Sequence, residues 1–242
     1  MARTVYLTSP EGSTGKSTIA LGLLDLFSAR VQRVGVFRPV VTEGEHDRVL
    51  ELLLKHDGVD LDYDRCVGVT YDQVHEDADA ALDTILTKAR ALAEECEVVV
   101  VVGSDYTDVA GPTELSFNAR IAANLNSPVV LVLGAQGRTP AQIRQGADVA
   151  VGERAAHHAK VAGIVANRCT PAALGGSREA LAGEVPVWTF PEIPLLSAPS
   201  VRDLMEALDG ELIAGEEAQL DREAEHMLVG AVGSAHLLDR LK

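Results

Sequence analysis

The feature that most constrains this chain is a glycine-rich turn between an apolar segment and a helical one. Residues 9–18 read Ser-Pro-Glu-Gly-Ser-Thr-Gly-Lys-Ser-Thr, after a strand-like run at 4–8 and before a helix-like run at 19–27. This order is typical of phosphate-binding loops, where backbone N–H groups and the positive end of a helix surround an anion. The turn therefore predicts an anion site between the first strand and the first helix.

The residue types in the turn suit three tasks of a nucleotide site. We expect the small residues of 12–15 to enclose the phosphates with backbone N–H groups, Lys16 to supply a cation to the terminal oxygens, and Ser17 to place a hydroxyl beside Mg²⁺. The full loop pattern has glycine at position 10, where this chain has Pro10. A vestigial loop that only keeps the fold is therefore the alternative. The predicted nucleotide-binding residues of the turn are Gly12, Ser13, Thr14, Gly15, Lys16, Ser17 and Thr18.

Apolar strand-like segments alternate with helical patterns along the chain. The predicted strands are 5–8, 34–37, 98–102, 129–133, 161–166 and 185–190. The predicted helices are 16–29, 47–55, 74–95, 115–125, 140–158, 175–182 and 200–208. Continuous apolar strands between helices indicate a parallel sheet that is covered on both faces. We therefore predict an α/β, three-layer P-loop NTPase-like fold with a mostly parallel central sheet and helices on both faces.

Polar residues stand where the predicted strands end. In an open parallel sheet, ligands bind at the carboxyl ends of the strands. We therefore expect the turn and the segments 38–39, 103–105 and 167–168 to lie along one rim. Arg38 would contact substrate or phosphate there, with a surface ion pair as the alternative. Asn167 would face the base of a nucleotide, with capping of a turn as the alternative.

Two aspartates are candidate Mg²⁺ ligands besides Ser17. Asp105 follows an apolar strand, where an acidic metal ligand often lies in P-loop proteins, but its position also suits a turn-forming residue. Asp47 begins a predicted helix, where an N-cap is equally in keeping with its position. The predicted metal site consists of Ser17, Asp47 and Asp105.

The net charge and the cysteines limit the classes of partner and the cellular compartment that we expect for this protein. The formal net charge is −15 at pH 7, which argues against nucleic acid and anionic membranes as partners. The longest apolar run, 98–102, is too short to cross a bilayer. The three cysteines form no C-x-x-C pair, and the chain enters a strand at once without a signal peptide. We therefore expect free thiols in a cytoplasmic protein.

The character of the chain changes near residue 210. An acidic segment at 215–225 precedes a new apolar stretch at 228–233, and together they are too short to bury a core. We therefore predict a P-loop domain at 1–210. Residues 211–242 would form a linker and the incomplete start of another domain.

Several of these segments together resemble a known family. Five segments are similar to parts of the dethiobiotin-synthetase-like P-loop fold. They are the turn at 8–17, Val-Phe-Arg-Pro-Val at 36–40, His-Asp-Arg-Val-Leu-Glu-Leu-Leu at 46–53, Gly-Ile-Val-Ala-Asn-Arg at 163–168 and Phe-Pro-Glu-Ile-Pro at 190–194. Closer still is the resemblance to the N-terminal domain of long-type bacterial phosphate acetyltransferases. The segments at 222–232 and 236–241 resemble the opening of the DRTGG-type domain that follows it.

The resemblance implies a role within a longer enzyme of acetate metabolism. The full enzyme would convert acetyl-CoA and phosphate into acetyl phosphate and CoA in a C-terminal acyltransferase domain beyond this chain. The chain itself would have regulatory and assembly roles and no assigned catalytic residue. Its partners would be ATP or another nucleotide with Mg²⁺, or a metabolite effector, within a homo-oligomer.

Two alternatives stay open. One is an ATP-dependent carboxylase or ligase of the dethiobiotin-synthetase type. Those enzymes carry a lysine before the proline of the second strand, whereas this chain has Arg38, and a guanidinium does not deprotonate readily. They also carry a Glu-Gly-rich loop where this chain has Gly-Ser-Asp-Tyr at 103–106. The other alternative is a structural module with an empty loop, although Lys16 and Ser17 favour nucleotide binding.

Overall fold

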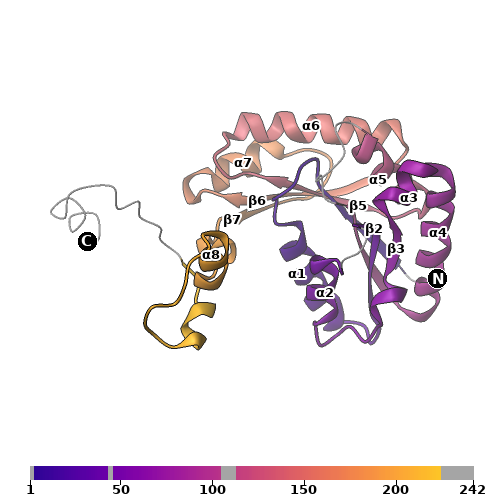
Figure 1. Ribbon diagram of the computed structural model, residues 1–242. Helices are drawn as coiled ribbons and strands as arrows, with labels where there is room; N and C mark the ends of the chain where they lie inside the picture. Colours follow the sequence, from indigo (N-terminus) through magenta and orange to yellow (C-terminus); the bar gives the residue numbers. More distant parts are fainter. Residues whose placement is uncertain (1–2, 43–45, 105–112, 225–242) are drawn as a thin grey trace. The chain divides into compact units, whose positions relative to one another are not determined.

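The computed structural model describes residues 3–42, 46–104 and 113–224 (Figure 1). The chain divides into two compact units, Met1–Glu192 and Ile193–Lys242. The predicted domain boundary at 210 stays a prediction.

The first unit is built on seven strands, all paired in parallel, in the order β3-β2-β4-β1-β5-β6-β7. β1 lies near the centre, between β4 and β5. The parallel sheet predicted from the apolar runs is therefore confirmed. The strands are β1 (Arg3–Thr8), β2 (Val34–Val41), β3 (Val67–Thr70), β4 (Val98–Val102), β5 (Val129–Gly134), β6 (Val161–Cys169) and β7 (Val187–Pro191).

Because helices cover both faces of the sheet, its central strands carry apolar side chains on both sides. β4 consists of five valines, all of them buried. Alternate residues of β1 face opposite sides: Tyr6 packs in one core cluster and Leu7 in another. This is the pattern expected of a parallel strand buried on both faces.

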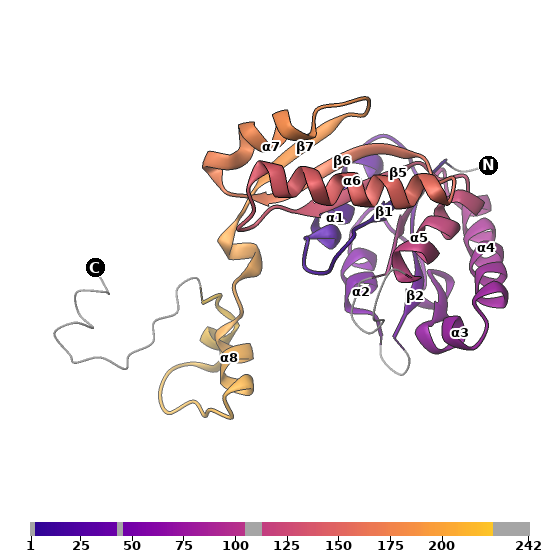
Figure 2. The same cartoon turned by 90° about the horizontal axis from the view of Figure 1, so that it is seen from above.

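In the described part of the first unit, helices lie on both faces of the sheet (Figures 1 and 2). Leu24 of α1 and Leu50 of α2 pack with Leu7, whereas Phe117 of α5 packs with Tyr6. The first face carries α1 (Lys16–Ser28) and α2 (Arg48–Leu54). The second carries α3 (Tyr71–Glu76), α4 (Ala78–Glu95), α5 (Thr113–Asn124), α6 (Pro140–Ala156) and α7 (Leu174–Leu181). The predicted helices on both faces are thus confirmed.

Two local features of the first unit differ from the sequence-based expectation. The helix predicted at 74–95 is interrupted at Asp77, whose carboxylate accepts the N–H groups of Asp79 and Ala80, each at 3.0 Å, and so caps α4. The short strand β3, which the sequence pattern did not predict, pairs with the end of β2. Short 3-10 turns complete the unit at Tyr63–Arg65 and Pro171–Ala173.

The second unit contains little regular structure within residues 193–224. Ser200 caps α8 (Val201–Ala207) as predicted, and short 3-10 turns lie at Pro194–Ser197 and Glu217–Asp221. An isolated antiparallel bridge joins Ser200 to Glu223. The segments at 228–233 and 236–241 lie outside the described residues.

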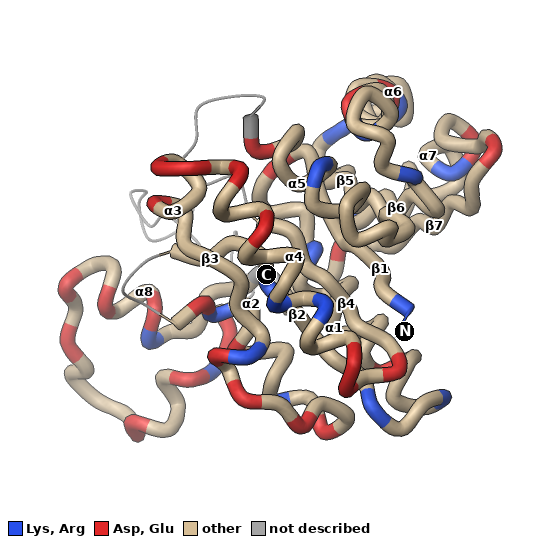
Figure 3. The backbone as a smooth tube through the Cα atoms, turned by 90° about the vertical axis from the view of Figure 1, so that its right-hand side faces the viewer, with Lys and Arg blue, Asp and Glu red and all other residues tan. Residues whose placement is uncertain are grey.

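The cysteines follow the expectation of free thiols. All three cysteines are free thiols and are buried. Asp and Glu residues occur in several of the described elements (Figure 3). None of the described helices combines the length and apolarity that crossing a membrane requires.

Candidate functional site

The glycine-rich turn joins the end of β1 to the start of α1, as predicted. Gly15 is the N-cap of α1 and has a φ of 75°, a left-handed conformation that glycine adopts without strain. Glycine has no side chain with which to cap the helix, and the first turn carries no acidic residue. The N-terminus of α1 therefore keeps the backbone donors and the dipole that attract an anion.

A cavity of about 180 Å³ opens at this helix N-terminus. Val49 contributes to its wall, which brings the start of α2 to the same opening. Gly12 and Thr18, which the sequence analysis also assigned to the site, are not among its lining residues. The residues that line the cavity are Ser13, Thr14, Gly15, Lys16, Ser17 and Val49.

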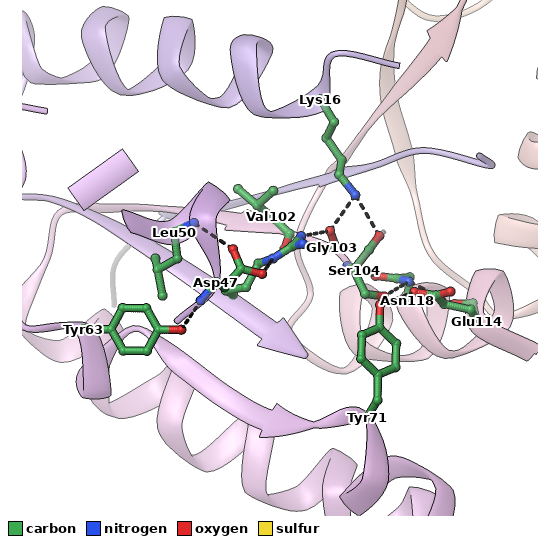
Figure 4. A network of polar contacts seen from close by, with 11 residues as sticks. Lys16, Asp47, Leu50, Tyr63, Tyr71, Val102, Gly103, Ser104, Glu114 and Asn118 are labelled. Carbon is green, nitrogen blue, oxygen red and sulfur yellow. Dashed lines mark hydrogen bonds and ion pairs between the residues drawn. The ribbon is translucent and has the colours of Figure 1, made fainter. Parts of the chain in front are cut away.

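Lys16 is buried, and its ammonium group reaches the carboxyl end of β4. Its Nζ donates to the carbonyl oxygens of Gly103 at 2.6 Å and Ser104 at 2.7 Å (Figure 4). Only 4% of the residue is exposed. Lys16 thus links the glycine-rich turn to the end of β4, and it also lines the cavity.

Arg38 converges on the same strand end from β2. Its Nη1 donates to the carbonyl oxygens of Gly103 and, at 3.3 Å, Val102, and its Nε donates to Asp47 at 3.0 Å. Lys16 and Arg38 therefore share one carbonyl acceptor, that of Gly103. Arg38 forms an ion pair, the alternative considered for it, but its side chain is only 5% exposed, so the pair is not a surface one.

Asp47 acts as an N-cap in this structure. Its Oδ1 accepts the N–H of Leu50 at 2.8 Å, and its Oδ2 accepts Nε of Arg38. Because both oxygens already accept hydrogen bonds, a metal ion would have to compete with Arg38 for Oδ2. The oxygen donors Ser17 and Asp47 are of the type that Mg²⁺ prefers. Asp105, the third predicted ligand, lies outside the described residues.

The described side chains form no ready-made metal centre. Within residues 3–42, 46–104 and 113–224, no group of three His, Cys, Asp or Glu residues is arranged to hold a metal ion.

Asn167 lies against the turn rather than away from it. Its Nδ2 donates to the carbonyl oxygen of Thr14 at 2.9 Å, and a Cβ added to Gly15 would lie 2.4 Å from the same nitrogen. Asn167 is 8% exposed. The amide of Asn167 thus supports the loop, which is close to the turn-capping alternative considered for it.

The structure also reveals supports for the turn that sequence reasoning did not identify. Arg138, which follows β5, donates to both carboxylate oxygens of Glu11 at 2.5 Å. Arg168, next to Asn167 at the end of β6, donates to the carbonyl oxygen of Ser13 at 2.8 Å. The position of Arg168 at a strand end was the available signal for its role. No sequence pattern pairs Arg138 with Glu11, because 127 positions separate them.

A buried polar network continues from the end of β4 toward α5 (Figure 4). Asn118 donates to the hydroxyl of Ser104 at 2.9 Å and accepts the hydroxyl of Tyr6 at 2.7 Å. Tyr71 donates to Glu114 at 2.9 Å. Burial raises the pKa of the Tyr6 and Tyr71 hydroxyls above their ordinary values, so both remain protonated donors near neutral pH.

Two curated proteins that are similar to this chain are named phosphate acetyltransferase. Among curated proteins, the phosphate acetyltransferase of Synechocystis sp. (strain ATCC 27184 / PCC 6803 / Kazusa) is 30% identical over 98% of this chain and 36% of its own length. The phosphate acetyltransferase of Nitratidesulfovibrio vulgaris (strain Hildenborough) is 25% identical over 99% of the chain and 36% of its own length. The chain thus spans about a third of the length of these curated relatives.

Solved structures with the same fold include chloroplast FtsY from Physcomitrella patens, with a TM-score of 0.54 over 77% of this chain and 57% of that one. The signal recognition particle receptor FtsY from Elizabethkingia anophelis, in complex with GDP, has a TM-score of 0.50 over 77% and 56%. Both are 15% identical to this chain, so the likeness is one of fold alone.

Residues 3–200 match the family model AAA_26, described as an AAA domain. The matched region contains β1, the turn and α1, the residues that line the cavity, and the ends of β2, β4 and β6. The chain therefore belongs to the AAA_26 family of P-loop domains, which includes dethiobiotin synthetase.

Proposed function

We propose that this chain is the nucleotide-binding domain of a phosphate acetyltransferase and serves regulation and assembly. Similarity to phosphate acetyltransferases over 98% and 99% of its length supports the parent enzyme. The longer enzyme would convert acetyl-CoA and phosphate into acetyl phosphate and CoA. The observation that carries the nucleotide-binding part is the cavity at the N-terminus of α1, with the buried ammonium of Lys16 at its wall.

The ligand would be ATP or another nucleotide with Mg²⁺. The backbone of 13–15 would enclose the phosphates, and Lys16 would exchange the carbonyls of Gly103 and Ser104 for terminal phosphate oxygens. Ser17 and Asp47 would hold Mg²⁺, which would neutralise phosphate charge. The ligand would favour one arrangement of a homo-oligomer through its different affinity for two states.

The surroundings of Arg38 favour this proposal over a carboxylase or ligase of the dethiobiotin-synthetase type. Its guanidinium donates to Asp47 and to the carbonyls of Val102 and Gly103, so it is held inside the protein as a permanent cation. A carboxylase would need at this position an amine that can lose its proton. Turnover of ATP in the presence of a diamine and bicarbonate would support the carboxylase alternative.

Thermal unfolding with and without ligand tests nucleotide binding. A ligand at 100 times its dissociation constant adds about 2.7 kcal/mol to the free energy of unfolding. We expect ATP with Mg²⁺ to raise the melting temperature of the unaltered chain and Lys16→Ala to abolish the rise. Lys88→Ala is the matched control, because Lys88 also donates to two backbone carbonyls, those of Val67 and Gly68, but on an edge strand.

The outcomes separate the alternatives. If no nucleotide shifts the melting temperature of the unaltered chain, a structural module with an empty loop is correct. If Lys16→Ala retains the shift, Lys16 has no role in the site. A regulatory role further predicts that nucleotide changes acetyl phosphate formation by the full-length enzyme, and that Lys16→Ala removes this response.

A further inference from the structure

Two adjacent residues at the end of β6 hold one side of the phosphate-binding turn. Asn167 donates to the carbonyl of Thr14, and Arg168 donates to the carbonyl of Ser13. A trans peptide is planar, and its C=O and N–H point in opposite directions. Holding these two carbonyls toward β6 therefore directs the N–H groups of Thr14 and Gly15 away from β6. The orientation of two donors in the turn thus depends on contacts with another strand.

The guanidinium of Arg168 is in turn held by Glu192. Its Nε and Nη2 donate to the two carboxylate oxygens at 2.8 and 3.0 Å, in a bidentate arrangement that fixes the plane of the guanidinium. The side chains of Arg168 and Glu192 are 23% and 15% exposed. The backbone N–H of Glu192 donates to the carbonyl of Cys169 at 2.8 Å, which anchors the carboxylate beside the end of β6.

The backbone at both ends of the Arg168–Ser13 hydrogen bond is in the left-handed region. The φ angles are 63° at Arg168 and 57° at Ser13, which few residues other than glycine adopt. Such conformations persist where the surrounding structure holds them in place. The ion pair with Glu192 and the bond to Ser13 are the contacts that the side chain of Arg168 supplies for this purpose.

We propose that Arg168 is a positioning residue for the anion site and that Glu192 holds its guanidinium in the required orientation. The inference rests on the proposed nucleotide binding and deepens it. Affinity for the phosphates then depends on a carboxylate that acts on the turn through Arg168.

Positioning and simple charge attraction predict opposite results for two variants. Glu192→Gln removes a negative charge near a bound anion, so charge alone predicts tighter binding. Arg168→Lys keeps the positive charge, so charge alone predicts little change. Positioning predicts weaker binding in both, because each variant loses the bidentate pair and an ammonium cannot reproduce the guanidinium geometry.

The experiment is a calorimetric titration of the full chain with ATP and Mg²⁺ and, separately, with inorganic tripolyphosphate. We expect Glu192→Gln and Arg168→Lys to weaken binding of both ligands by a similar factor, roughly tenfold, because both ligands use the same backbone donors. Arg144→Lys is the matched control, since Arg144 forms an exposed ion pair with Asp148 on α6. Melting temperatures without ligand confirm that each variant is folded.

Two failures can be told apart. Binding by the unaltered chain, together with unchanged or tighter binding by Glu192→Gln, would overturn the inference alone. Absence of binding by the unaltered chain would overturn the proposed function and this inference with it. If Arg168→Lys does not fold, the nearly isosteric Glu192→Gln variant still tests the inference. Weaker binding supports positioning, and tighter binding supports charge attraction.

Discussion

Replacement of Gly15 by alanine tests how tightly β6 holds the phosphate-binding turn. Gly15 has a φ of 75°, and an added Cβ would lie 2.4 Å from Nδ2 of Asn167. The alanine therefore meets two penalties: a left-handed backbone, and displacement of an amide that donates to the carbonyl of Thr14.

The two penalties have separate magnitudes. The left-handed conformation costs an alanine about 1–2 kcal/mol. Loss of the buried hydrogen bond from Asn167 adds about 1 kcal/mol. We therefore expect Gly15→Ala to lower the free energy of unfolding by about 2–3 kcal/mol, a large fraction of the stability of an ordinary domain.

Two other glycines provide matched controls in the same urea titration. Gly137 has a φ of 68°, but an added Cβ would meet nothing within 4 Å, so Gly137→Ala should show the backbone penalty alone. Gly22 lies within α1 with open space around it, so Gly22→Ala should stabilise the chain by up to about 1 kcal/mol. The fluorescence of Trp188 on β7 and circular dichroism would report unfolding. Equal losses for Gly15→Ala and Gly137→Ala would refute a tight contact with Asn167.

Two further predictions concern a helix cap and the response to alkaline pH. Asp77→Ala should destabilise the chain by about 1 kcal/mol in urea, because it removes the cap of α4; exposed Asp83→Ala on the same helix is the control, and equal effects would contradict the cap. Burial raises the pKa of Cys66 from 9.0 to about 12. Above pH 9 the unfolded chain loses a proton that the folded chain keeps, so the free energy of unfolding should fall between pH 9 and 12. Cys66→Ala should make that fall shallower, and an unchanged slope would contradict the assignment.

The strands and helices were predictable where their patterns were long. The valine run of β4 and the helix-like run of α1 after the turn each indicate one structure, and both were placed within a residue or two. The strand β3 was missed because it has four residues and contains Gly68. The break before α4 was missed because Asp77 stands in an acidic stretch. There the sequence does not distinguish an aspartate that caps a helix from one that is only exposed to solvent.

The location of the candidate site was predictable, but its internal contacts were not. The rule that ligands bind at the carboxyl ends of parallel strands brought the turn, Arg38 and Asn167 to one edge. Lys16 contacts the backbone carbonyls of Gly103 and Ser104, which lie 87 and 88 positions away in the sequence. Every residue has a backbone carbonyl, so the residue types do not identify these acceptors. The sequence therefore does not predict such contacts, whereas it does predict the glycine-rich turn and the strand ends.

The most direct measurement is a crystal structure of the chain with ATP and Mg²⁺. We expect the nucleotide in the cavity at the N-terminus of α1, with Nζ of Lys16 moved from the carbonyls of Gly103 and Ser104 to a terminal phosphate oxygen. An empty cavity at saturating nucleotide, or a nucleotide bound while Lys16 keeps both carbonyls, would contradict the account.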